Sequence, residues 1–376
     1  MIRDITISNF RKFERFELNN LGRINILVGP NNTGKTTVLE GVFALCCGLN
    51  FNPFYNNIIL SRRSNNDAIN IFDLADSIDN AMCFYNEKYT SSFEAYDKNG
   101  EFYKVEHTFT PTLLMSEVNS SISSANQNLD IEETDFNTQN GRVIHSKHLG
   151  SWIIANQANE SVENTITFPP RIFKSQKHNY QARFNDTFAY RSKGNMNQVY
   201  SSLKRQPDIF KDFLSEVQNL FPEVKTFDMF PYSDGSSAPV SVIKKDESIV
   251  TINYFGDGFR RWFHLLGTMI KDKNSIQLVE EIDATFHYEA QIELSKNLYR
   301  YCDNYDTQLF ASTHNLEFID IFLKSIRNIG EEELENVRII TLKNSADGKT
   351  IARNLSGKEA LELRNDFNME IRKWRI

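Results

Sequence analysis

The sequence predicts an α/β fold with a largely parallel sheet, and three observations support this prediction. Residues 1–48 have the pattern of three strands, a glycine-containing loop and a helix. Residues 259–345 alternate between helical and strand periodicity three times, which is typical of parallel strands joined by covering helices. The chain between these two pieces mixes both periodicities, which indicates a mixed α/β insertion.

The N-terminal piece begins with two strands expected to be antiparallel. The segments "ITISNF" and "FERFEL" alternate apolar and polar residues with period two, which predicts half-buried strands. The segment "INILVG" is almost wholly apolar and predicts a buried strand. The following "TTVLEGVFALCCG" predicts a helix that ends near Gly48.

The middle of the chain is less regular. The turn signal "DKNG" lies between two alternating segments and predicts a hairpin, as does "VSVIKKDESIVTI" further on. Residues 116–141 are rich in Ser, Asn, Gln and acids, which predicts a flexible surface segment. A helix is predicted near residues 207–221, because apolar side chains recur there at helical spacing: Phe210, Phe213, Leu214, Val217, Leu220 and Phe221.

We therefore expect one core in two pieces, residues 1–50 and 240–345. Residues 51–239 would form the mixed α/β insertion, and residues 346–376 would extend the core. A chain of 376 residues that is 40% hydrophobic can bury a core of this size.

Composition also excludes several classes of protein. No run of about 18 apolar residues is present, so no membrane span is expected, and the first residues resemble a strand pair rather than a signal peptide. A net charge of −7 excludes a uniformly basic nucleic-acid binder. The four cysteines lack zinc-ligand spacing and predict a reduced, cytoplasmic setting: Cys46, Cys47, Cys83 and Cys302.

The loop "GPNNTGKT" matches the phosphate-binding pattern G-x-x-x-x-G-K-[ST] in full. Its glycines let the backbone N–H groups and the N-terminus of the next helix face an anion. Lys35 would neutralise the β- and γ-phosphates of ATP, and the Thr36 hydroxyl would bind Mg²⁺. The sequence therefore predicts a P-loop NTPase core. Its nucleotide-binding residues would be Gly29, Asn31, Asn32, Thr33, Gly34, Lys35, Thr36 and Thr37.

Three further motifs follow in order along the chain. The segment "FGDGFRR" precedes a predicted helix, "LVEEID" ends a predicted strand, and "FASTHN" ends the next one. The carboxyl ends of parallel strands meet at one edge of a sheet, so the last two motifs should lie together. The residues of interest are Gly256, Asp257, Gly258, Glu280, Glu281, Thr313 and His314.

This order of motifs resembles the ABC-type ATPases of the RecF, SMC and OLD group. It also resembles the ATPase subunits of bacterial anti-phage systems that lack a Toprim domain, of the PtuA or AriA kind. The resemblance covers both core pieces, roughly half the chain, and does not reach the insertion. It implies an ABC-type core, ATP and Mg²⁺ as cofactors, and ATP hydrolysis to ADP and phosphate. It also implies a nucleotide sandwiched between subunits, because Gly256–Gly258 would close over the γ-phosphate bound by another copy.

The resemblance also assigns roles to single residues. Glu281 would orient or deprotonate the attacking water, His314 would sense the γ-phosphate, and Lys35 would act with them in catalysis. Thr36 and Glu280 would hold Mg²⁺. The arginine of the opening strand, which reaches toward the nucleotide in the family, corresponds to Arg11.

Two departures from the family pattern matter. The glycine motif lacks its leading serine, and Glu280 stands where the family has Asp. One extra methylene moves the carboxylate by about 1.5 Å, which is near the scale at which Mg²⁺ geometry becomes strained. Two alternatives follow: either Mg²⁺ is held through water, or hydrolysis is slow.

Two hypotheses remain for the use of ATP. In the first, dimers or larger oligomers of this chain sense a trigger and hold a separate nuclease or toxin-like effector in anti-phage defence. In the second, the chain is an ATP-dependent DNA-binding protein of the RecF repair type. Residues 169–205 carry eight Lys or Arg residues, one acid and interleaved aromatics, which is typical either of a DNA contact or of a core with a solvated face.

Overall fold

A computed structural model of the chain describes residues 1–47, 54, 57–58, 90–108, 142–145, 151–155, 166–167, 180–230, 238–367 and 370–372. The segment predicted to be flexible, residues 116–141, lies outside the described residues, and so does Cys83. In the part of the chain that is described, every helix is too short or too polar to span a bilayer.

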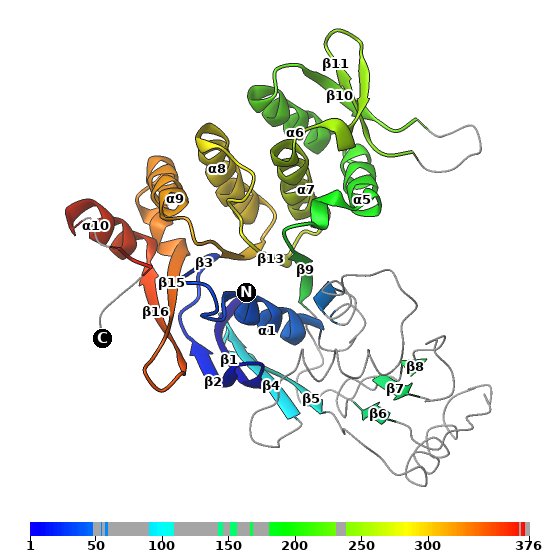
Figure 1. The fold of residues 1–376 in the computed structure, drawn as a ribbon. Coiled ribbons are helices and arrows are strands. Elements are labelled where there is room, and N and C mark those ends of the chain that lie inside the picture. The colour runs from blue at the N-terminus through cyan, green and yellow to red at the C-terminus, as the bar shows by residue number, and fades with distance from the viewer. Residues whose placement is uncertain are drawn as a thin grey trace, which may run out of the picture.

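The core is a six-stranded sheet with the order β16-β15-β3-β14-β13-β9 (Figure 1). Five of its strands are parallel, and β16 pairs antiparallel with β15 at one edge. The strands are β3 (Ile24–Val28), β9 (Gln181–Asn185), β13 (Ser275–Val279), β14 (Gln308–Ser312), β15 (Val337–Asn344) and β16 (Thr350–Ser356). This sheet confirms the predicted α/β fold.

Helices cover one face of the sheet. The predicted alternation of helix and strand is confirmed by α7 (Asp257–Lys271), α8 (Tyr288–Asn304) and α9 (Leu316–Ile329), which alternate with β13, β14 and β15. Further helices on this side are α5 (Lys193–Lys204), α6 (Pro207–Leu220) and α10 (Gly357–Phe367). Phe213 and Val217 of α6 are buried, as its spacing predicted.

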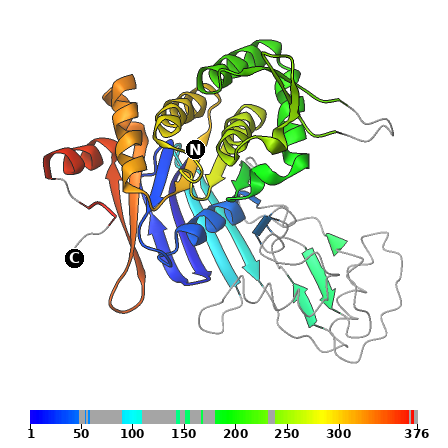
Figure 2. The ribbon, with the colours of Figure 1, turned by 45° about the horizontal axis from the view of Figure 1, so that its top comes forward.

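The other face of the sheet packs on α1 (Lys35–Cys47) and on a second, antiparallel sheet with the order β2-β1-β4-β5 (Figure 2). Alternate residues of β3 point to opposite faces of the sheet. Ile26 and Val28 belong to the apolar cluster of the helical face, whereas Leu27 belongs to the cluster around α1. The second sheet consists of β1 (Ile2–Phe10), β2 (Phe13–Leu18), β4 (Thr90–Asp97) and β5 (Phe102–Thr108).

Both predicted hairpins are present. β4 and β5 pair around "DKNG", and β11 (Ser241–Lys244) pairs with β12 (Ile249–Thr251). β10 (Val224–Asp228) completes the three-stranded sheet of the second hairpin. A further small sheet contains β6 (Arg142–His145), β7 (Ser151–Ala155) and β8 (Ile166–Thr167), and the 3₁₀ turns are η3 (Ala189–Arg191), η4 (Ile252–Tyr254) and η5 (Glu332–Asn336).

One core strand comes from an unexpected part of the chain. β9 lies within residues 51–239, the stretch predicted to be inserted, yet it pairs in parallel with β13 and forms an edge of the core sheet. Its sequence "QARFN" is short and contains a single large apolar residue, Phe184, so its periodicity gave no signal. The core therefore takes in residues that the expected division left out.

Candidate nucleotide site

The phosphate loop joins β3 to α1, and its backbone requires glycine at two positions. Gly29 and Gly34 have φ values of 139° and 98°. A Cβ atom at Gly29 would stand 2.4 Å from the Leu342 carbonyl oxygen, and one at Gly34 would stand 2.8 Å from the Phe13 ring. Both the left-handed conformation and the close approach exclude a side chain.

Two lysines hold this loop. The Lys35 ammonium donates hydrogen bonds to the carbonyls of Gly29 (2.7 Å) and Pro30 (2.9 Å), which places its charge inside the curve of the loop. The Lys12 ammonium donates to the Asn32 carbonyl (2.6 Å) and to Asn344 Oδ1 (2.8 Å). Burial lowers the pKa of both lysines, and in Lys35 the nearby Glu281 opposes that shift. The sequence prediction omitted Lys12, although it directly follows Arg11.

A cavity of about 540 Å³ lies over the loop. Side chains from the turn between β1 and β2, the phosphate loop, and the ends of β13 and β14 line it together. Thr187, Ser312 and Thr313 also line it without having been assigned a site role. The predicted site residues that line this cavity are Arg11, Asn31, Asn32, Gly34, Lys35, Thr36, Thr37, Glu280, Glu281 and His314.

The two glutamates follow β13 in a constrained turn. Glu281 has a φ of 45°, and its N–H donates to Ser312 Oγ (3.1 Å). The buried Arg261 donates to the carbonyls of Glu280 (2.6 Å) and Glu281 (2.7 Å). Surrounding contacts of this kind can keep a residue in a sparsely populated conformation. Arg261 therefore fixes the backbone that carries both carboxylates.

Glu281 and His314 face each other across the ends of two neighbouring strands. His314 Nδ1 lies 3.9 Å from Glu281 Oε1, and these side chains are 61% and 51% exposed. The pair is therefore open to the cavity.

A buried hydrogen bond supports the turn before His314. Thr313 Oγ1 donates to Asp283 Oδ1 (2.5 Å) and accepts from the Asn315 N–H (3.0 Å), while the Thr313 N–H donates to the Leu27 carbonyl (3.0 Å). The sequence prediction assigned no role to Asp283. Its signal was present, because Asp283 is the third acid of "EEID" directly after a buried strand.

Arg11 lies at the cavity wall, where it has a structural partner. Its guanidinium forms an ion pair of 2.9 Å with Glu40 of α1, whose side chain is fully buried. The ion pair joins the turn between β1 and β2 to the helix that follows the phosphate loop. The predicted contact of Arg11 with nucleotide stays a prediction.

The glycine motif lies at the N-terminus of α7, outside the residues that line the cavity. Tyr254, just before it, is 84% exposed. Asp257 pairs with Arg191 (2.9 Å) and with Arg260. Desolvation acts to raise the pKa of Asp257, but hydrogen bonds from these arginines and from Tyr190 leave it below its usual value. A Cβ atom at Gly258 would stand 2.9 Å from the Thr285 carbonyl, which explains this glycine.

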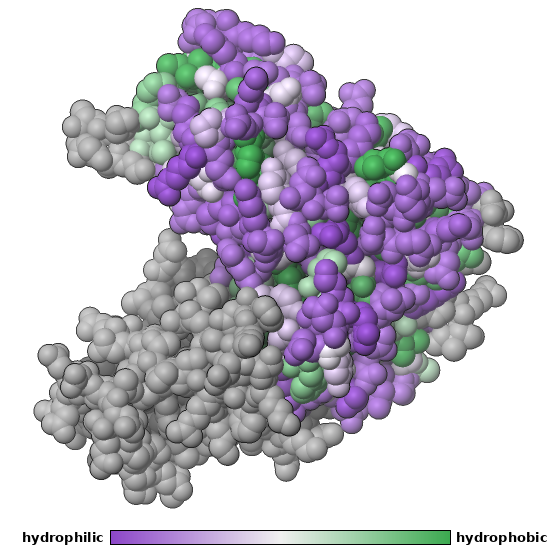
Figure 3. Space-filling view, turned by 180° about the vertical axis from the view of Figure 1, so that it is seen from behind, coloured by the Kyte–Doolittle hydropathy of each residue, from purple (hydrophilic) through white to green (hydrophobic). Residues whose placement is uncertain are grey.

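The basic stretch is described from Tyr180 to Arg205. Phe184, Tyr190 and Tyr200 are buried, whereas Phe188 is exposed. In this part of the stretch most aromatics therefore belong to the core. The face of the molecule shown in Figure 3 is mainly hydrophilic over the described residues, with only small apolar spots.

Comparisons with known proteins show similarity to nucleotide-hydrolysing and DNA-repair proteins. A curated relative from Helicobacter pylori, named "ATP/GTP phosphatase", is 22% identical over 354 residues, covering 87% of this chain and 89% of its own. The DNA replication and repair protein RecF of Idiomarina loihiensis is 38% identical over 52 residues, covering 14% of this chain and 15% of its own. A solved SMC head bound to the C-winged helix domain of ScpA aligns with a TM-score of 0.47 and 12% identity, covering 96% of this chain and 99% of that one.

A family model matches most of the chain. The model describes an AAA ATPase domain and covers residues 46–319. This range begins after the phosphate loop, so the match does not depend on that loop. The chain belongs to the AAA ATPase domain family.

Proposed function

We propose that two copies of this chain complete each other's ATP site, so that ATP binding drives oligomerisation. The observation that carries this proposal is the division of the site residues. The cavity collects the phosphate loop, Glu280, Glu281 and His314, whereas Gly256–Gly258 begin α7 outside the cavity lining, next to the exposed Tyr254. A second copy could bring this helix N-terminus to the phosphates, where its N–H groups would stabilise negative charge.

The residues of the cavity fit a magnesium ion. Mg²⁺ is usually held by one or two carboxylates together with waters and substrate phosphates. The Thr36 hydroxyl and the Glu280 carboxylate line the same cavity and supply such a set. Among the described residues, no group of three or more His, Cys, Asp or Glu could hold a metal alone. A bound Mg²⁺ would neutralise phosphate charge, and the longer Glu280 side chain would either hold it through water or slow hydrolysis.

Three residues of the chain have the remaining roles in ATP hydrolysis. Lys35 binds the β- and γ-phosphates from within the loop. Glu281, fixed by Arg261 and Ser312, orients the attacking water or takes its proton. His314, opposite Glu281, responds to the γ-phosphate. Phosphoryl transfer needs this positioning and charge neutralisation more than covalent help.

We further propose that the ATP-bound oligomer holds a separate effector and releases or activates it on a trigger in anti-phage defence. The order of motifs supports this proposal, because it resembles that of ATPase subunits without a Toprim domain. A RecF-like DNA-binding role is the second candidate, favoured by the local match to RecF. The burial of Phe184, Tyr190 and Tyr200 removes these rings from base stacking and weakens that candidate.

The first experiment tests the shared site. Glu281→Gln should bind ATP with Mg²⁺ without turning it over, and should accumulate as a dimer or larger oligomer in size-exclusion chromatography with light scattering. Glu317→Gln is the matched control, because Glu317 is an exposed acid of α9 outside the cavity lining. Wild-type turnover in Glu281→Gln would refute the catalytic assignment.

The second experiment distinguishes the effector function from the RecF-like DNA-binding function. The chain is purified with the product of the neighbouring gene, with and without ATP. A stable, ATP-dependent complex with a nuclease or toxin-like protein supports the effector proposal. Salt-sensitive, ATP-dependent DNA binding without such a partner would replace it with the RecF-like function.

A further inference from the structure

Residues 370–372 lie near the carboxyl ends of the core strands, where the nucleotide site is built. Ile371 is 2% exposed and packs in the apolar cluster of the helical face. Its carbonyl accepts a buried hydrogen bond of 2.7 Å from Thr341 Oγ1 on β15. Thr341 is the register partner of Val28, the last residue before the phosphate loop. The segment is therefore anchored at the same level of the sheet as that loop.

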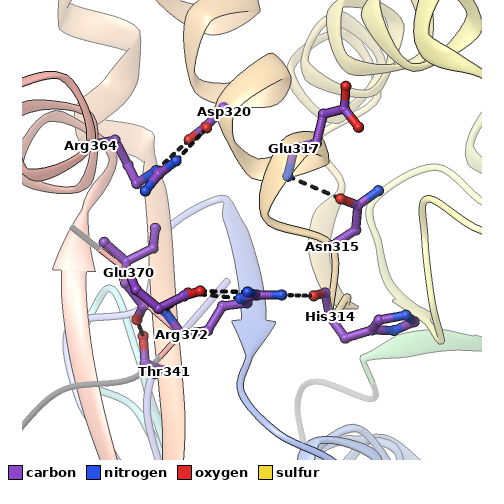
Figure 4. A network of polar contacts seen from close by, with 9 residues as sticks. His314, Asn315, Glu317, Asp320, Thr341, Arg364, Glu370 and Arg372 are labelled. Atoms are coloured by element: carbon purple, nitrogen blue, oxygen red, sulfur yellow. Dashed lines mark hydrogen bonds and ion pairs between the residues drawn. The ribbon is translucent and has the colours of Figure 1, made fainter. Parts of the chain in front are cut away.

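Arg372 extends from this anchor to the turn after β14. Its Nη1 donates a hydrogen bond of 2.7 Å to the carbonyl oxygen of His314, which lies 58 residues earlier in the chain (Figure 4). Its Nε donates to Glu370 Oε1 (2.7 Å), and its Nη2 donates to Glu370 Oε2. These two hydrogen bonds with Glu370 fix the orientation of the guanidinium and raise the pKa of Arg372.

His314 lies between two residues that are held by other contacts. Thr313 is fixed by Asp283 and by the Leu27 carbonyl. Asn315 caps α9, because its side chain accepts from the N–H groups of the next turn. The hydrogen bond from Arg372 adds a third constraint and acts on the His314 peptide group itself. Holding that peptide group restrains the backbone position from which the imidazole projects, and the imidazole faces Glu281.

We propose that Arg372 is a positioning residue for His314. It holds the His314 backbone so that the imidazole stays over the cavity beside Glu281. The contact also links the segment after α10 to the nucleotide site, since a displacement of residues 370–372 would release the His314 carbonyl. This inference rests on the proposed function in one respect, the role of His314 in ATP turnover.

The test compares Arg372→Ala with a matched control. Arg364 lies on α10 and forms a comparable bidentate ion pair with Asp320 of α9, with both hydrogen bonds at 2.7 Å. Figure 4 shows that this pair lies away from His314. Arg372→Ala should lower kcat for ATP by about ten-fold and leave KM within about two-fold, because His314 acts on bound nucleotide. Arg364→Ala should keep the wild-type kcat, although both variants lose an ion pair.

A double-mutant cycle then tests the route of the effect. Removing Arg372 in a His314→Ala background should change kcat by less than about two-fold, because no imidazole is left to position. Equal falls of kcat in Arg372→Ala and Arg364→Ala, or a full ten-fold further loss in the double variant, would overturn the inference. His314→Ala alone tests the proposed function: a wild-type kcat there would refute the role of His314 and, with it, the inference. If His314→Ala lowers kcat and Arg372→Ala does not, only the inference fails.

Discussion

Gly29→Ala should move the start of the phosphate loop by about 1 Å. The new Cβ atom would stand 2.4 Å from the Leu342 carbonyl oxygen, whereas ordinary contact begins at 3.4 Å. The carbonyl belongs to β15, which pairs with strands on both sides, so the loop must give way. The φ of 139° at Gly29 adds strain for any L-residue, on the order of 1–3 kcal/mol.

This displacement should affect the nucleotide more than the fold. A misplacement of about 1 Å can cost about 100-fold in rate, because the reacting groups no longer meet in the required geometry. Gly348→Ala is the matched control. Gly348 also has a positive φ, 80°, but a Cβ atom there meets nothing within 4 Å. It should cost about 1–2 kcal/mol of stability and leave ATP turnover unchanged.

The assay combines thermal unfolding with ATP binding and turnover for both variants. We expect Gly29→Ala to retain a cooperative unfolding transition while turnover falls by about 100-fold. Turnover within a few-fold of the wild type in Gly29→Ala would show that the loop does not hold phosphate in the way described.

Two further predictions concern stability and the metal. Burial, and then the charges of Arg183 and Arg261, lower the pKa of His264 to about 3. In the unfolded chain His264 has its ordinary pKa of about 6.5, so between these two values the unfolded chain binds a proton that the native state does not bind. Stability should therefore fall as pH drops through this window, by ~2 kcal/mol at pH 5, and His264→Leu should remove that part in urea unfolding at pH 7 and pH 5. An unchanged pH dependence in the variant would contradict this assignment. A chelator should abolish ATP turnover, and Glu280→Asp should lower the Mg²⁺ concentration that restores half of it, because the shorter side chain withdraws the carboxylate by about 1.5 Å. A higher Mg²⁺ requirement in Glu280→Asp would show that the cavity is built around the longer acid.

The alternation of helices and strands after residue 259, and part of the cavity lining, could be predicted from local sequence patterns. Strands β3, β13 and β14 are buried over their whole length, and most of their residues are apolar. The phosphate loop and the acids after β13 are contiguous motifs, so their place in the chain is visible without a structure. Parallel topology then brings Lys35, Glu281 and His314 to one edge of the sheet.

Other features depend on contacts between distant residues and left little trace in the sequence. β9 joins the core sheet through a five-residue strand with one large apolar side chain. Glu40 looks like an ordinary acid on α1, but its ion pair with Arg11 makes it a buried link between two elements. Arg372 reaches His314 from 58 residues away, a separation that no local periodicity encodes.

The shared nucleotide site is tested most directly by mixing two inactive variants. Lys35→Ala disables the phosphate loop, and Gly256→Glu adds a negative charge at the start of α7, where a Cβ atom meets nothing within 4 Å of its own chain. In an equal mixture, half of the dimers should pair one variant with the other, and each such dimer regains one of two sites. We therefore predict that mixing restores about a quarter of wild-type ATP turnover, although each variant alone has almost none. Turnover that stays at the level of the separate variants, or wild-type turnover in Gly256→Glu alone, would contradict the shared site.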